Sequence, residues 1–220
     1  AVDGTPGDHL NPTLVSGSHD WKSLATGVSH TCAVTTAGVG YCWGNSVATG
    51  GSGDTSTPVS GNHTWASIST GWINSCGVTT AGDAYCWGNG VMGQIGDGGT
   101  SARSTPTLVS GSYTWASIST SIASRHTCGV TTAGAGYCWG LNGANQIGNG
   151  GAYSNVCDSS EEPCALVPTR ASGGHTWKSI SVGQEYACGV TTAGVGYCWG
   201  NSGATGGGGG STPAKITLPW

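Results

Sequence analysis

Charge is the scarcest property of this sequence. Only 7% of its residues are charged, against about 25% in an average soluble domain. The formal net charge is -4, so the basic surface that nucleic-acid binding requires is missing. No apolar run approaches the ~20 residues that a membrane-spanning helix needs. We therefore expect neither a nucleic-acid partner nor a membrane span.

Motifs that carry catalysis or bind metal are also missing. The ten cysteines include no C-x2-C pair, so the usual zinc spacing is absent. The glycine run Gly206–Gly210 is not followed by the Lys-Ser/Thr of a phosphate-binding loop. No Ser-His-Asp order and no paired-glutamate signature is found. We expect a protein that is not an enzyme and that has no cofactor or metal. A hydrolase is the alternative, and catalytic turnover that is lost when one histidine is mutated would support it.

A thirteen-residue phrase recurs four times, at Cys32, Cys76, Cys128 and Cys188, and reads C-(A/G)-V-T-T-A-G-x-x-Y-C-W-G. Successive copies begin 44, 52 and 60 residues apart. A phrase built on Trp-x-Ser precedes each copy, and a Pro-containing phrase such as Thr105–Gly111 precedes that. The pattern of each unit therefore predicts four short strands, which together would form one blade of a β-propeller.

We expect an all-β protein of four such units in one propeller domain, forming either a small closed ring or an open arc. The predicted divisions are an N-terminal arm with an outer-strand phrase (1–18), then repeats at 19–62, 63–112, 113–174 with an insertion, and 175–220 with a terminal outer strand. The strand phrases at 11–17 and 211–218 give the four units five outer strands. Either the chain is part of a larger propeller, or one end strand lies on another molecule.

The two cysteines of each phrase are predicted to face each other across a hairpin with a three-residue Thr-Ala-Gly loop. In such a loop the glycine adopts a left-handed conformation, and this predicts disulfides Cys32–Cys42, Cys76–Cys86, Cys128–Cys138 and Cys188–Cys198. Cys157 and Cys164 enclose an insertion with Asp158, Glu161 and Glu162, which predicts a pinned surface loop and, as an alternative, a cation site or recognition loop. Five disulfides and an N-terminus at Ala1 without Met favour a mature protein secreted into an extracellular, oxidising compartment.

The units resemble repeats of the regulator of chromosome condensation superfamily, and in particular the Cys-bearing repeats of its secreted bacterial members. The matching residues are Ile68–Gly71 and Ile180–Gly183, His30–Cys32 and His126–Cys128, the Tyr-Cys-Trp-Gly ends, and the turns at Gln94–Gly98 and Gln146–Gly148. The resemblance implies propeller blades, usually seven, and no catalytic residues, because members present loops to partners. Known roles in the family are nucleotide exchange on a small GTPase, chromatin contact, light sensing by clustered tryptophans and inhibition of β-lactamase.

Departures from the family pattern limit what the resemblance implies. The Gly-Gln-Leu-Gly turn is replaced by Ala48–Gly51 in the first unit and by Ala204–Gly207 in the fourth. Only four units are present, and the missing basic surface and the oxidising compartment disfavour the nuclear and photoreceptor roles.

The loop between the first and second strands differs in sequence among the units, and such loops gather on one rim of a propeller. Trp, Arg and Tyr are enriched at interface hot spots, and Trp72 has no aromatic counterpart in the other units. The predicted rim residues are His30, Trp72, Asn74, Arg125, His126, Glu185 and Tyr186. The alternative is that Trp72 packs over its own blade and that the histidines at repeat positions are structural.

Two functions follow from these patterns. The first is a secreted, non-catalytic module that binds a protein or glycan partner through one rim. The second is a self-associating structural subunit of an extracellular fibre or surface assembly, favoured by low charge and a surplus strand edge. Asn62-His63-Thr64 is a sequon that makes Asn62 a candidate glycosylation site.

Overall fold

The computed structural model describes residues 14–15, 17–49, 55–151, 155–157, 161–203, 205 and 209–217. Each repeat forms one antiparallel sheet, called a blade below, and the four main strands of each blade lie side by side in chain order. Blades 1 and 2 contain β1 (Trp21–Thr26), β2 (His30–Thr35), β3 (Gly40–Gly44) and β4 (Thr57–Pro58), then β5 (Trp65–Thr70), β6 (Asn74–Thr79), β7 (Ala84–Gly88) and β8 (Arg103–Leu108). A short helix, α1 (Ser46–Thr49), lies between β3 and β4.

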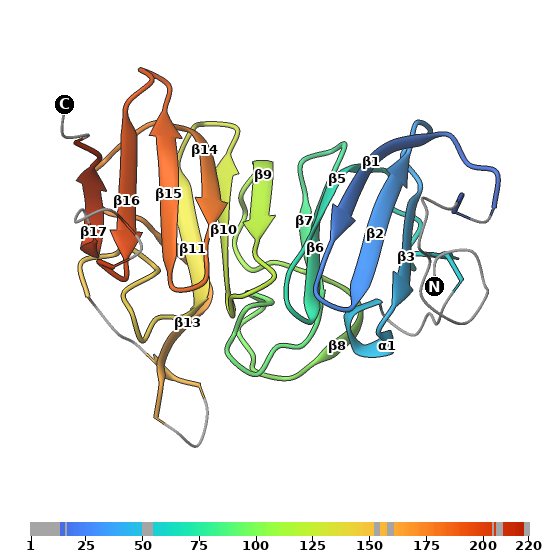
Figure 1. The fold of residues 1–220 in the computed structure, drawn as a ribbon, viewed down its shortest axis with the longest axis horizontal. Coiled ribbons are helices and arrows are strands. Elements are labelled where there is room, and N and C mark those ends of the chain that lie inside the picture. The colour runs from blue at the N-terminus through green and yellow to red at the C-terminus, as the bar shows by residue number, and fades with distance from the viewer. Residues whose placement is uncertain are drawn as a thin grey trace.

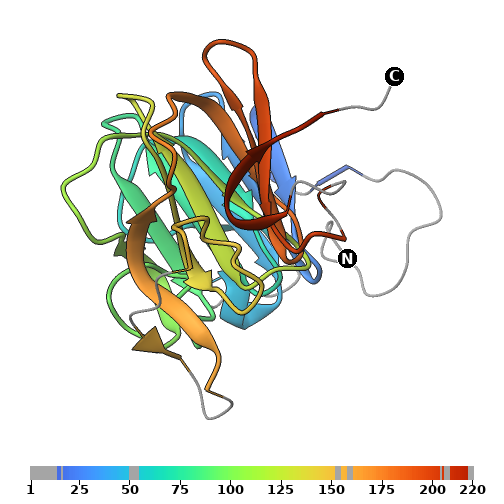
Figure 2. The same ribbon diagram turned by 90° about the vertical axis from the view of Figure 1, so that its left-hand side faces the viewer.

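Blades 3 and 4 repeat this plan. They contain β9 (Trp115–Thr120), β10 (His126–Thr131), β11 (Gly136–Leu141) and β13 (Pro163–Arg170), then β14 (Trp177–Val182), β15 (Tyr186–Thr191), β16 (Gly196–Gly200) and β17 (Gly210–Lys215). The insertion in blade 3 adds β12 (Asn155–Val156), which pairs with β13 as a fifth strand. This β12–β13 hairpin extends beyond the body of the blade (Figures 1 and 2). The expected all-β blade architecture is confirmed.

The four blades form an open arc. The first strand of each blade contacts the first and second strands of the blade before it, through the pairs β1–β5, β5–β9, β9–β14, β2–β5, β6–β9 and β10–β14. Blades 1 and 4 lie at opposite ends of the row (Figure 1). Of the two expected forms, the described residues therefore adopt the arc. Most of the expected outer-strand phrase at 11–17, and Trp220, lie outside the described residues.

The predicted hairpins are present in all four blades. Cys32 pairs directly with Cys42 in the β2–β3 register, and the backbone N–H of Gly38 donates to the carbonyl of Thr35 at 2.9 Å. Gly38 has φ of 81°, the left-handed conformation that the tight loop requires. The structure contains disulfides at the five pairs that the sequence predicted. The repeated phrase is thus a cross-linked hairpin at the centre of each blade.

Repeated aromatic residues form a column within each blade. In blade 2 the ring of His63 lies 4.1 Å from that of Tyr85, and Trp65 lies 5.6 Å from Trp87 between ring centroids. The same column recurs in the other three blades. The histidines that precede Trp are therefore structural, as the alternative reading expected, and they act by packing against tyrosine.

Turns of the Gly-Gln-Leu-Gly type connect neighbouring blades. The indole N–H of Trp139 in blade 3 donates to the carbonyl of Gln94 in blade 2 at 3.0 Å. The indole of Trp199 in blade 4 donates to the carbonyl of Gln146 in blade 3 at 2.9 Å. Where the first unit lacks this turn, the buried Trp87 indole has no acceptor among the described atoms. Each turn thus satisfies a buried donor of the following blade.

Candidate binding rim

The loops that join first and second strands bring side chains from three blades together. Trp72 follows β5, Arg125 precedes β10 and Glu185 precedes β15. The guanidinium of Arg125 lies 5.0 Å from the centre of the Trp72 ring, within the range of a cation–π contact. Trp72 keeps 38% of its surface exposed. The pair therefore links blades 2 and 3 at the surface.

Three adjoining hollows make a groove beside this pair. The first, of about 350 Å³, is lined by Trp72, Ile122, Ala123, Arg125, Leu141, Gln184 and Glu185. The second, of about 360 Å³, shares Arg125, Leu141 and Glu185 with the first, and adds Met92, Gln146 and Glu162 among others. The third shares Gln184 and Glu185 and continues to Tyr186, Asn201 and Gly203. We call this continuous feature the rim groove.

The rim groove mixes one cation, two carboxylates and aliphatic side chains. Glu185 accepts a hydrogen bond from the side-chain amide of Asn201 at 2.7 Å, which fixes its carboxylate at one wall. Glu162 is contributed by the insertion between Cys157 and Cys164. Such a surface offers apolar contact area and paired positive and negative hydrogen-bonding groups to a ligand.

Sequence reasoning placed seven residues on this rim, and the structure brings four of them to the groove: Trp72, Arg125, Glu185 and Tyr186. The other three, His30, Asn74 and His126, are buried, with 3%, 3% and 1% of their surfaces exposed. They occupy the first positions of β2, β6 and β10, and the neighbours of two of them, Ser75 beside His30 and Tyr186 beside His126, belong to the next blade. Their side chains are therefore not available to a partner at the surface.

The two buried histidines differ in their partners. The Nε2 atom of His30 lies 2.9 Å from the hydroxyl of Ser75 in the next blade. Neither ring nitrogen of His126 makes a hydrogen bond of good geometry, although the backbone of Tyr186 lies nearby. Burial lowers the pKa of His30 to about 4 and that of His126 to about 3. Both rings are neutral near pH 7, because burial has removed the water that would solvate a protonated ring.

Sequence reasoning missed the aliphatic members of the groove, Ile122, Leu141 and Met92. Ile122 carried a usable signal, since it is an aliphatic residue in a loop whose sequence differs among the units; in the structure it is 51% exposed. Leu141 and Met92 come from different blades and pack beside the Cys157–Cys164 disulfide, a contact that the sequence alone does not show.

The insertion and the glycosylation candidate complete the predicted sites. Asp158 lies outside the described residues, and no group of metal-binding side chains is found in the part of the chain that the structure describes. Asn62 is exposed in a turn with φ of 53°, and its glycosylation stays a prediction. Among the described helices, none is long and apolar enough to span a membrane.

Comparison with known proteins identifies the repeat. The model of the Regulator of chromosome condensation (RCC1) repeat matches residues 81–130, while no curated protein matches the chain. Yeast RCC1 (Prp20) bound to Kap60 superposes with a TM-score of 0.77 at 19% identity, over 94% of this chain and 50% of that one.

Two further solved structures are similar in fold to this chain. Prp20p from Saccharomyces cerevisiae gives a TM-score of 0.79 at 19% identity over 94% of this chain and 52% of its own. Human WBSCR16 gives 0.73 at 18% identity over 90% and 52%. The chain thus spans about half the length of the structures it matches, as an open arc of blades would. The chain therefore contains a match to the RCC1 repeat at residues 81–130, has a fold similar to these solved structures, and carries a disulfide in each of its four repeats.

Proposed function

We propose that this protein is a secreted, non-catalytic module that binds a protein partner through the rim groove. The observation that carries the proposal is the Trp72–Arg125 pair, half-exposed at the wall of a groove built from three blades. Tryptophan and arginine are the residue types that most often dominate interface energetics. A rigid aromatic anchor already ordered by its neighbour costs less entropy when a partner binds.

Protein is favoured over glycan by the composition of the groove. One face of the Trp72 ring, on which a sugar would stack, is covered by Arg125. The aliphatic side chains of Ile122 and Leu141 and the carboxylates of Glu162 and Glu185 suit a protein surface of mixed character. Yeast RCC1 is described as bound to Kap60, and Prp20p as binding Gsp1p and histones; these partners support protein binding as a use of the fold.

Secretion and the lack of catalysis belong to the same proposal. Five disulfides are expected of a protein that folds in an oxidising compartment. The histidines at the start of β2 and β10 are buried and held neutral. They are therefore poorly placed to exchange protons with a substrate in the groove.

Selection of displayed peptides against the immobilised protein tests the proposal. We expect selected peptides to lose affinity by about 100-fold or more on Trp72→Ala with Arg125→Ala, since two hot-spot side chains contribute roughly 3 kcal/mol or more together. Val28→Ala is the matched control, because Val28 is an exposed residue in the corresponding loop of blade 1, outside the groove. A glycan array run in parallel separates the two partner classes. Peptides that bind the double variant as tightly as the parent would overturn the assignment of the groove.

A further inference from the structure

The second hollow of the rim groove is lined by a glutamine that lacks one hydrogen-bond partner. In blade 2 the equivalent side chain, Gln94, accepts a hydrogen bond from a backbone N–H of its own turn at 2.8 Å, and its nitrogen donates to Asn89 at 2.9 Å. In blade 3 the side-chain oxygen of Gln146 likewise accepts from a backbone N–H, at 2.7 Å. The position of Asn89 is taken by Leu141, whose side chain offers no acceptor. The amide nitrogen of Gln146 therefore loses the partner that the blade 2 glutamine has.

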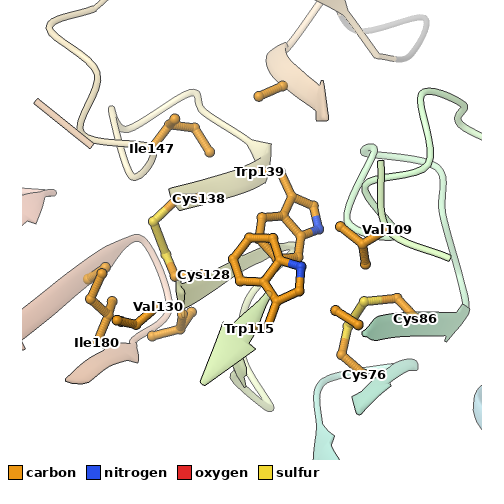
Figure 3. Close-up of a cluster of buried hydrophobic side chains, with 14 of the residues drawn as sticks. Cys76, Cys86, Val109, Trp115, Cys128, Val130, Cys138, Trp139, Ile147 and Ile180 are labelled. Atoms are coloured by element: carbon orange, nitrogen blue, oxygen red, sulfur yellow. A yellow bond between two sulfur atoms is a disulfide. The ribbon is translucent and has the colours of Figure 1, made fainter. Parts of the chain in front are cut away.

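This glutamine is buried and is held in place before any ligand arrives. Gln146 is 1% exposed, and no described residue accepts a hydrogen bond from its amide nitrogen. Its carbonyl oxygen accepts from the indole of Trp199 at 2.9 Å. The next residue, Ile147, is fully buried in the core cluster that includes Cys138 (Figure 3). Buried polar groups are nearly always hydrogen-bonded, so an acceptor that enters the hollow meets a fixed and unpaired donor.

Two carboxylates line the same hollow, those of Glu162 and Glu185. The side-chain amide of Asn201 donates to one oxygen of Glu185 at 2.7 Å, which fixes the carboxylate but leaves its charge unneutralised. Among the described residues, neither carboxylate forms an ion pair. The cation among the lining residues, Arg125, lies against the ring of Trp72. Two carboxylates and one guanidinium give the hollow a net negative charge.

We propose that the second hollow of the rim groove receives a lysine or arginine side chain of the partner protein. The cation pairs with Glu162 and Glu185, and a main-chain carbonyl of the same segment accepts a hydrogen bond from the Gln146 amide. The aliphatic stem of either side chain packs on Met92 and Leu141. The inference rests on the proposed function, since it names the part of a protein partner that this hollow recognises.

A polypeptide fits this hollow better than a metal ion, which carboxylates alone would also attract. A metal ion offers no acceptor to the Gln146 amide, whereas every lysine or arginine residue of a polypeptide brings a carbonyl oxygen together with its cation. In the part of the chain that the structure describes, no group of metal-binding side chains is found. The combination of an unpaired donor and two unpaired carboxylates therefore selects a basic peptide segment.

Displayed peptide libraries that differ only in one central residue, fixed as Lys, Arg, Gln or Glu, test the inference. After selection against the intact protein, we expect binders from the Lys and Arg libraries and none from the Glu library. Selected peptides should lose affinity about 10-fold or more on Glu162→Gln with Glu185→Gln, because charge-assisted hydrogen bonds to the cation are lost. Asp20→Asn with Asp83→Asn is the matched control, since both are exposed carboxylates outside the groove. An equal loss in the control would show that net charge alone attracts the peptides, and would overturn the inference.

Substitution of Leu141 tests the Gln146 amide separately. Leu141→Asn places an acceptor where Asn89 accepts from Gln94 in blade 2, so the amide is satisfied within the protein. Leu141→Ala removes the same apolar contact without supplying an acceptor. Peptide affinity should fall about fivefold further in the asparagine variant than in the alanine variant. Equal affinities would contradict the role of the amide, and thermal unfolding checks that every variant is folded.

The variant Trp72→Ala with Arg125→Ala separates failure of this inference from failure of the proposed function. Peptides that depend on this pair, but come equally from the Gln library and ignore the two glutamate substitutions, would leave the rim groove as the binding site and refute its basic-residue pocket. Peptides that bind the Trp72→Ala, Arg125→Ala variant as tightly as the parent would refute the proposed function itself. A selection that yields no binder from any of the libraries would refute both.

Discussion

The unpartnered ring of His126 offers a direct test of how the blades recognise each other. In blade 1 the matching histidine, His30, meets the Ser75 hydroxyl of the next blade at 2.9 Å. Ser75 directly precedes the first hairpin cysteine of blade 2, and the residue at that position in blade 4 is Ala187. By this correspondence, the methyl group of Ala187 stands at the repeat position where blade 2 has the Ser75 hydroxyl. The substitution Ala187→Ser should supply the missing partner.

The expected gain follows from the burial of both groups. Ala187 is 0% exposed and His126 is 1% exposed, so a hydroxyl introduced here is cut off from water. A protein hydrogen bond contributes about 1 kcal/mol net, and we expect Ala187→Ser to raise the free energy of unfolding by about that amount. For a chain of this size the thermal midpoint should rise by about 2–4 °C.

Thermal and urea unfolding of four proteins measure the effect: the parent, Ala187→Ser, His126→Asn and the double variant. The cycle isolates the coupling between the two side chains, and Asn is a natural occupant of this position as Asn74. The serine should stabilise only when His126 is present. A buried hydroxyl without a partner costs about 1 kcal/mol or more, so destabilisation by Ala187→Ser in the parent would refute the reasoning.

Two further predictions concern the joints between blades. The free energy of unfolding should fall as the pH drops from about 6.5 towards 4. Histidines in the unfolded chain bind protons at the ordinary pKa of 6.5, whereas burial lowers the pKa of His30 to about 4 and that of His126 to about 3. Each histidine contributes a slope of at most about 1.4 kcal/mol per pH unit. Melting curves between pH 7 and 4 measure this, and a slope unchanged by His30→Asn would contradict it. Trp139→Phe should cost about 1 kcal/mol more than Trp87→Phe, because both indoles are 0% exposed but only Trp139 donates to a carbonyl, that of Gln94. Urea denaturation compares the two variants, and equal losses would show that the indole hydrogen bond contributes nothing.

Much of each blade could be predicted from local sequence. The Thr-Ala-Gly loop fixes a hairpin of one register, and that register places Cys76 opposite Cys86 without reference to the rest of the chain. The positive φ of Gly82 is a property of the loop alone. Strand order and disulfide pairing follow from the same short-range geometry, so four repeats of one phrase determined four equivalent blades.

The binding rim depends on contacts between blades, and these were predicted only in part. Trp72 and Arg125 stood out because they broke the repeat, yet their contact depends on how blades 2 and 3 pack. His30 and His126 were expected at the surface, but the first position of the second strand turns into the joint. Sequence spacing records the position in a strand but does not show which face a neighbouring blade covers.

The sequence by itself determined the disulfide-linked hairpin, its four-strand blade and the resemblance to RCC1-type repeats, because these depend on interactions within about fifty residues. Only the tertiary structure decided that the four blades form an open arc with a groove at one rim. The physical reason is that curvature arises from packing between blades. A valine that reads the same in every repeat is therefore buried in three blades and exposed in the fourth, according to whether a neighbour covers it.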